Sequence, residues 1–135
     1  MDTLTPQERS ARMARVRAKD TKPEMQVRRL VHRLDYRYRL HRRDLPGTPD
    51  MVFPGRGKVI FIHGCFWHGH AGCALARLPK SRGDFWPSKL AANAERDARN
   101  TRALRRLGWG VLTIWECQLR DMARVTNRIE RFLDA

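Results

Sequence analysis

The pattern of apolar and polar residues along the chain predicts four strands and four helices. Lys58–His63 has an uninterrupted apolar centre and Val111–Trp115 is equally apolar, which indicates two buried strands. A short strand is expected over Met51–Phe53, and the turn residues of Pro54–Gly57 predict a hairpin. Apolar and polar residues alternate over Tyr36–His41, which predicts a fourth strand.

The helices are predicted from capping signals and helical spacing. Thr5–Ala18 begins with a Thr-Pro start signal but carries few apolar residues. Thr21 and Glu24 have the spacing of a capping box at the start of a second helix. A third helix is expected from residue 86 or 87 to 107, and a fourth over Asp121–Leu133. The expected inward residues of the third helix are Leu90, Ala94, Ala98, Leu104 and Leu107.

The order of these elements predicts an α/β domain, with a mixed β-sheet flanked by helices. At 135 residues, without an internal repeat or a long linker, the chain is expected to be a single domain over residues 1–135. Within it, residues 1–19 are expected to form a basic N-terminal arm.

The charge balance favours an anionic partner. The chain has 28 Lys+Arg against 14 Asp+Glu and a formal net charge of +14, so nucleic acid is the first candidate. A solvated basic face is the simpler alternative, and an anionic membrane surface is the rival. No apolar run reaches membrane-spanning length and no signal-peptide core is evident, so we expect no membrane partner. We expect a bacterial cytoplasmic protein that associates with the nucleoid by binding DNA.

A dense group of Cys and His residues predicts a structural zinc site. Three cysteines in a reducing compartment do not make a disulfide framework and favour metal binding. Cys65, His70 and Cys73 supply three ligands, and Cys117, the remaining cysteine, is expected to be the fourth. The alternative is three unrelated buried thiols.

Acidic residues near the strand ends predict a site for a hard cation. Asp50 begins one strand of the hairpin and the next strand ends at Ile62-His63, so both lie on one rim of the sheet. Phosphodiester hydrolysis uses a divalent cation held by oxygen ligands, which Asp50 and the Ile62 carbonyl supply, with Glu24 as a further carboxylate. Alternatively, Asp50 is a turn residue and Glu24 only caps its helix.

His68 is the candidate acid–base group, because imidazole titrates near neutral pH. It precedes His70 by two residues, so a role as a metal ligand stays equally open.

Phe66 and Trp67 lie inside the proposed zinc loop, where aromatic rings suit stacking on bases or wedging between them. Phe85-Trp86 is a second aromatic pair beside a loop.

Five motifs together resemble the very-short-patch repair (Vsr) endonucleases. They are DTKPE at 20–24, LPGTPD at 45–50, VIFIHGCFWH at 59–68, NAERD at 93–97 and WEC at 115–117. The resemblance implies a restriction-endonuclease-like core and Mg²⁺-dependent, strand-specific nicking of duplex DNA. The implied cut lies 5′ to the thymine of a T:G mismatch, which arises when 5-methylcytosine deaminates.

The resemblance also implies roles for individual residues. Asp50 and the Ile62 carbonyl would hold Mg²⁺, and His68 would activate the attacking water, with Glu24 and His63 as further active-site residues. The implied zinc ligands are Cys65, His70, Cys73 and Cys117. The implied intercalating residues are Phe66, Trp67 and Trp86 from the major-groove side and Met13 from the opposite side. The implied mismatch contacts are Lys89 and Asn93, and Asp97 is a supporting acidic residue.

Two positions depart from the family pattern. Ile62 stands where Thr is more frequent, and Ala71-Gly72 makes the zinc loop one residue longer. Two alternatives therefore stay open, a nicking endonuclease with another mismatch or sequence specificity and a zinc-stabilised DNA-binding module without catalysis. The expected partner is double-stranded DNA with a T:G mismatch, bound by a monomer because the lesion is asymmetric. Mismatch-repair proteins are further candidate partners.

Overall fold

The computed structural model describes residues 21–70, 73 and 85–135. The expected helix over Thr5–Ala18, with Met13, lies outside them. The helices are α2 (Lys22–Arg33), α3 (Phe85–Arg106) and α4 (Met122–Asp134), with 3₁₀ turns η1 (Pro54–Arg56) and η3 (Glu116–Arg120). The strands are β1 (Arg39–Leu40), β2 (Met51–Phe53), β3 (Lys58–His63) and β4 (Gly110–Trp115).

The four strands form one mixed sheet, as expected, and their order in it is β1-β2-β3-β4. The first three strands run antiparallel, with Met51 opposite Ile60 in the β2–β3 hairpin. β4 pairs in parallel with β3, and the connection between them contains α3. Because β2 and β3 are antiparallel, the start of β2 and the end of β3 meet at one edge of the sheet.

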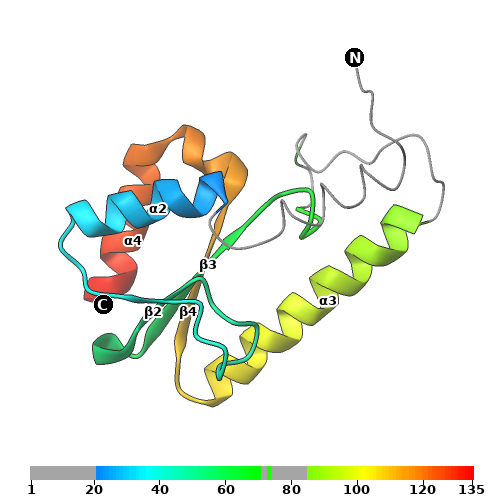
Figure 1. The fold of residues 1–135 in the computed structure, drawn as a ribbon, viewed down its shortest axis with the longest axis horizontal. Helices are drawn as coiled ribbons and strands as arrows, with labels where there is room; N and C mark the ends of the chain where they lie inside the picture. Colours follow the sequence, from blue (N-terminus) through cyan, green and yellow to red (C-terminus); the bar gives the residue numbers. More distant parts are fainter. Residues whose placement is uncertain (1–20, 71–72, 74–84) are drawn as a thin grey trace.

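Helices cover both faces of this sheet (Figure 1). On one face, α2 and α4 pack against alternate strand residues such as Met51, Ile60 and Ile114. On the other face, α3 contributes Leu104 to a smaller cluster with Val59. Successive side chains of a strand point to opposite faces, so a strand buried on both sides has the continuous apolar run seen in β3.

The predicted starts of α2 and α4 are confirmed by their caps. The Thr21 hydroxyl oxygen accepts a hydrogen bond from the Glu24 N–H at 3.4 Å. The Asp121 carboxylate accepts one from the Arg124 N–H at 3.1 Å. Both contacts satisfy an N–H group that the first helical turn leaves unpaired.

Two sequence predictions were wrong in extent. The strand expected over Tyr36–His41 is only Arg39–Leu40, since Asp35 and His41 adopt left-handed backbone angles on either side of it. Of the expected inward residues of the third helix, Leu90 and Leu104 are buried and Ala94 and Ala98 are exposed, while Leu107 lies just beyond the end of α3 and is 63% exposed. The helix face between the two buried leucines is polar, because it borders a cleft rather than the core.

No helix in the described ranges has the length and hydropathy needed to span a membrane.

Candidate active site and metal centre

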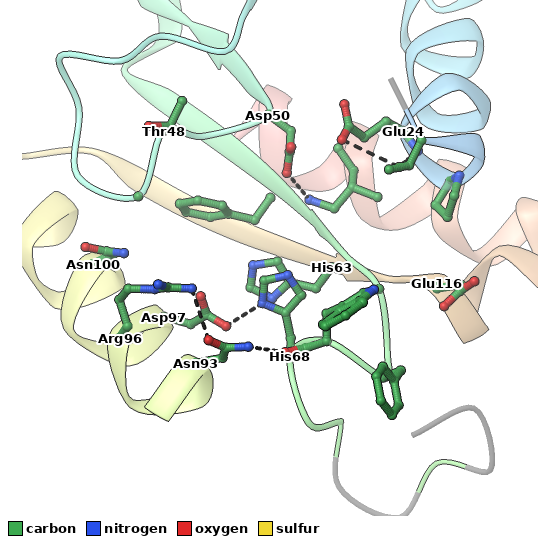
Figure 2. Close-up of a pocket in the computed structure, with 18 residues that line it drawn as sticks. Glu24, Thr48, Asp50, His63, His68, Asn93, Arg96, Asp97, Asn100 and Glu116 are labelled. Atoms are coloured by element: carbon green, nitrogen blue, oxygen red, sulfur yellow. Dashed lines mark hydrogen bonds and ion pairs between the residues drawn. The ribbon is translucent and has the colours of Figure 1, made fainter. Parts of the chain in front are cut away.

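A cleft of about 780 Å³ opens at the edge where β2 begins and β3 ends. Its walls come from α2, this edge of the sheet, the loop after β3 and the polar face of α3 (Figure 2). The four residues predicted to be catalytic all line it: Glu24, Asp50, His63 and His68. The fold therefore gathers into one space residues that are up to 44 positions apart in the chain (24 to 68).

Asp50 is held against the end of β3. Its Oδ2 atom accepts a hydrogen bond from the Ile62 N–H at 2.7 Å, which fixes the carboxyl group beside the backbone of the residue whose carbonyl is the other predicted Mg²⁺ ligand. Burial, with a smaller contribution from the nearby Glu24 carboxylate, raises the pKa of Asp50 to about 7. The Ile62 N–H and the Arg28 guanidinium act in the opposite direction. A bound divalent cation would favour the ionised form of this carboxyl group.

Glu24 both belongs to the helix cap and lines the cleft. Only 5% of the residue is exposed, and its Oε1 atom accepts a hydrogen bond from the Thr21 hydroxyl at 3.5 Å. Its Oε2 atom forms an ion pair with Arg28 at 3.0 Å and lies 3.5 Å from His41 Nε2. Sequence reasoning missed Arg28 and His41. Two features of the sequence could have indicated them: the helical spacing of Arg28 from Glu24, and the position of His41 at the end of a predicted strand.

His68 lies in a second group with His63 and Asp97. The Nδ1 atom of His68 is 2.5 Å from Asp97 Oδ2, and its ring stacks on His63 with centroids 3.8 Å apart. A carboxylate bonded to Nδ1 fixes the proton there and leaves Nε2 as the basic nitrogen. The sequence alone left open whether His68 is a base or a zinc ligand, and the fold places it with Asp97 rather than with the cysteines.

His63 is buried and neutral. Burial, with a smaller contribution from the adjacent His68 ring, lowers its pKa to about 4. Its Nδ1 atom has no hydrogen-bond partner within the part of the chain that the structure describes. Buried polar atoms are normally hydrogen-bonded, so this nitrogen is available to a water molecule or a ligand in the cleft.

The aromatic loop after β3 is tied to both neighbouring elements. The rings of Phe66 and Trp67 meet edge to face at 5.1 Å, and both line the cleft. The Asn93 side chain donates a hydrogen bond to the Trp67 carbonyl at 3.0 Å. Glu116 accepts one from the Cys65 N–H at 3.2 Å. Asn93 is 8% exposed in this arrangement, and its contact with a mismatch stays a prediction.

Two other predicted DNA contacts lie on α3. Lys89 is half-buried in its first turns, and nothing in the fold tests its role. Trp86 lies in the first turn of the same helix, but its side chain lies outside the described residues.

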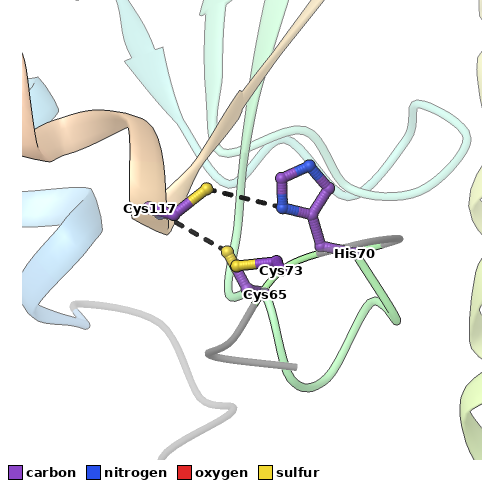
Figure 3. Close-up of side chains that lie close together, drawn as sticks. All are labelled: Cys65, His70, Cys73 and Cys117. Carbon is purple, nitrogen blue, oxygen red and sulfur yellow. Dashed lines mark hydrogen bonds between the residues drawn. The ribbon is translucent and has the colours of Figure 1, made fainter. Parts of the chain in front are cut away.

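The predicted zinc ligands converge in space although Cys117 lies 44 residues beyond Cys73 (Figure 3). One donor atom from each of Cys65, His70, Cys73 and Cys117 lies within 4.8 Å of all the others. Cys117 Sγ is 3.5 Å from His70 Nδ1, and the Cys117 N–H donates to Cys65 Sγ at 3.4 Å. None of Cys65, Cys73 and Cys117 forms a disulfide in this arrangement.

This donor set fits a zinc ion. Burial raises the pKa of Cys65 to about 12, so its thiolate needs a cation beside it. Three sulfurs and one imidazole nitrogen are a closed ligand set of the structural type. Ala71-Gly72, the segment that makes this loop one residue longer than the family pattern, lies outside the described residues.

Comparisons with known proteins agree on one family. A family model described as DNA mismatch endonuclease Vsr matches residues 1–74. The type II nicking enzyme V.XorIIP of Xanthomonas oryzae pv. oryzae is 52% identical over 133 residues, which cover 98% of this chain and 97% of that protein. The DNA mismatch endonuclease Vsr of Escherichia coli K12 is 40% identical over 119 residues, covering 88% of this chain and 76% of that protein.

A solved structure shares the fold. The catalytic domain of the homing endonuclease I-Bth0305I superposes with a TM-score of 0.58 over 84% of this chain and 94% of that domain. At 22% sequence identity, this likeness concerns the fold alone.

Proposed function

This chain belongs to the Vsr family of DNA mismatch endonucleases, and we propose that it nicks one strand of duplex DNA on the 5′ side of the thymine in a T:G mismatch, with Mg²⁺ as cofactor. The observation that carries the proposal is the convergence of Asp50 and His68 on one cleft, where Glu24 and His63 also lie. Such a pairing of a carboxylate and an oriented imidazole suits hydrolysis of a phosphodiester.

Asp50 is the central Mg²⁺ ligand in this proposal. Its carboxylate and the Ile62 carbonyl would hold the ion, and Glu24 would contact it through water. The Ile62 side chain is apolar, so only the backbone of this residue takes part. When bound, Mg²⁺ neutralises charge on the scissile phosphate and the leaving oxygen.

His68 is the general base. Asp97 holds the proton on Nδ1, so Nε2 takes a proton from the attacking water. The water oxygen bonds to phosphorus as the bond to the 3′ oxygen breaks, and that oxygen takes a proton from solvent water and leaves as a 3′-hydroxyl. The other end is a 5′-phosphate. The neutral His63 ring supports His68 from beneath through stacking.

Recognition of the lesion falls to the aromatic loop. Phe66 and Trp67 would wedge between base pairs, together with Trp86 and, from the opposite groove, Met13. The Cys/His cluster and Asn93 hold this loop in place, and Lys89 and Asn93 would contact the mismatch beside it. The net charge of +14 supplies the attraction to the phosphate backbone.

We propose that the protein acts as a monomer on DNA in the bacterial cytoplasm. Mismatch-repair proteins would then process the nicked DNA. A T:G mismatch has two different strands, so one active site per lesion is sufficient.

The names of two relatives, both type II nicking enzymes, support an alternative specificity for this chain. In this alternative the same chemistry is directed to another mismatch or another flanking sequence. A panel of all mismatches in several flanking sequences separates the two.

The deciding experiment is a nicking assay with a label on each strand in turn. We expect cleavage of only the thymine strand of a T:G duplex with Mg²⁺, and no cleavage with EDTA or with a matched T:A duplex. Asp50→Asn should abolish cutting, whereas Asp44→Asn, at an exposed carboxylate paired with Arg42, should retain it. Tight binding of the T:G duplex without cleavage under any divalent ion would instead identify a DNA-binding module.

A further inference from the structure

His41 reaches the active-site edge of the sheet through an unusual backbone. It directly follows β1 and has a φ of 49°, in the left-handed region that few non-glycine residues adopt. Its N–H donates to the Asp50 carbonyl at 3.4 Å, which continues the pairing of Leu40 with Met51. A strained residue persists where the surrounding structure holds it, and such residues gather at functional sites.

The imidazole of His41 accepts a hydrogen bond from Arg28. Its Nε2 atom lies 2.9 Å from Arg28 Nη2. A guanidinium can only donate, so this nitrogen carries the lone pair and the ring proton is on Nδ1. The contact links a residue of the β1–β2 connection to a residue of α2.

The same guanidinium is bonded to two further acceptors. Arg28 Nη2 donates to Glu24 Oε2 at 3.0 Å, and Nη1 donates to Met25 Sδ at 3.3 Å. The side chains of Arg28 and Glu24 are only 11% and 7% exposed. Bonded on several sides and shielded from water, the guanidinium is fixed in direction.

The direction matters because two carboxyl groups lie within reach. One atom able to bind a metal ion, a carboxylate oxygen or a ring nitrogen, from each of Glu24, His41 and Asp50 lies within 4.8 Å of the other two. A guanidinium and a divalent cation compete for the same carboxylate oxygens, since both are cationic and both bind them directly. Arg28 pairs with Glu24 in this structure, which leaves Asp50 facing the cleft with its bond to Ile62.

We propose that His41 is a positioning residue, which holds the Arg28 guanidinium on Glu24 and thereby keeps the Asp50 carboxylate accessible to the divalent cation. The inference rests on the proposed function, because it assigns a task to a residue around the proposed Mg²⁺ site. Without the acceptor on His41, Arg28 turns toward Asp50 and occupies the oxygens that the cation needs.

Two substitutions at position 41 distinguish the effect of losing the hydrogen-bond acceptor from the effect of losing the bulk of the side chain. His41→Leu removes the acceptor, and His41→Gln returns a carbonyl oxygen at a similar reach. His32→Leu is the matched control, because His32 is an exposed histidine near the end of the same helix as Arg28. Thermal unfolding of each variant verifies that it is folded.

The readouts are Mn²⁺ binding, followed by electron paramagnetic resonance, and nicking of the T:G duplex over a series of Mg²⁺ concentrations. Loss of a charge-assisted hydrogen bond should raise the Mn²⁺ dissociation constant and the half-saturating Mg²⁺ concentration about ten-fold in His41→Leu. His41→Gln should stay within about two-fold of wild type, because the acceptor is restored. Duplex affinity in EDTA should be unchanged in all three variants.

A double-mutant cycle tests the route through Arg28. In an Arg28→Leu background, His41→Leu should no longer weaken Mn²⁺ binding. The inference is overturned if His41→Leu binds Mn²⁺ like wild type, if His41→Gln is as weak as His41→Leu, or if the effect persists without Arg28. A wild-type protein that neither binds Mn²⁺ nor cuts the duplex would overturn the proposed function itself, which is a different result from any of these.

Discussion

The Nδ1 atom of His68 and the Oδ2 atom of Asp97 are 2.5 Å apart, across the space between the loop after β3 and helix α3. One turn earlier on the same helix, Asn93 holds the Trp67 carbonyl. A single helix face therefore orients both the proposed base and the proposed aromatic wedge. Displacement of α3 would disturb catalysis and lesion recognition together.

Replacing Asp97 with Asn should slow nicking without weakening DNA binding. The amide cannot stabilise the protonated imidazole, and it allows the ring proton to move to Nε2, so single-turnover nicking should fall about 10²-fold or more. Glu95→Gln, at an exposed position of the same helix, is the control and should cut at the wild-type rate. Equal rates for both variants would mean that Asp97 does not orient the base.

Asp50 should destabilise the folded protein as pH rises. Its folded-state pKa is about 7 and its ordinary value is 3.8, so between these values the folded chain holds the proton more tightly than the unfolded chain. The difference in unfolding free energy between wild type and Asp50→Asn (wild type minus variant) should therefore fall by roughly 2–4 kcal/mol from pH 4 to pH 8.

Urea denaturation at several pH values measures this difference. Asp44→Asn, at an exposed carboxyl group, should leave the pH dependence over this range as in wild type. Adding Mg²⁺ at pH 8 should recover part of the lost stability of wild type but not change Asp50→Asn, since the ion favours an ionised carboxylate. A flat difference between pH 4 and pH 8 would place Asp50 in water rather than in a buried site.

The Cys/His cluster should bind one zinc ion per chain, and His70→Ala should lose it. Structural zinc contributes directly to folding, so the variant should lose at least about 3 kcal/mol of unfolding free energy. Elemental analysis gives the metal content, and chelation of wild type should lower its thermal midpoint toward that of the variant. His32→Ala is the matched histidine control and should keep the metal. Full zinc content in His70→Ala would exclude His70 as a ligand.

Trp67→Ala should impair binding of the mismatch more than folding. A wedging or stacked ring contributes roughly 1–3 kcal/mol to DNA binding, so affinity for the T:G duplex should drop about ten-fold or more. Trp109→Ala is the comparison, because Trp109 packs against the core cluster of Val59 and Leu104 and its loss should mainly lower the thermal midpoint. The reverse pattern, a large loss of stability for Trp67→Ala, would assign Trp67 to the core.

The sequence alone determined most of the elements and their type. The bounds of β2 and β3 were predicted to the residue, because apolar runs bounded by turn residues mark a buried hairpin locally. The spacing of Thr21 and Glu24 likewise predicted the start of α2, since a cap is made within one turn. The inner face of α3 was predicted wrongly, because apolar spacing cannot show that Asn93, Asp97 and Asn100 face a cleft.

Only the tertiary structure decided which residues act together. The placement of His68 beside Asp97, apart from the Cys/His cluster, depends on an element that lies 29 residues away in the chain. The contact of His41 with Arg28 depends on the pairing of β1 with β2 and on the packing of α2 beside that edge. Local spacing specifies contacts within a turn or a hairpin, whereas contacts across elements follow from how the sheet and its helices pack, which no short stretch of sequence encodes.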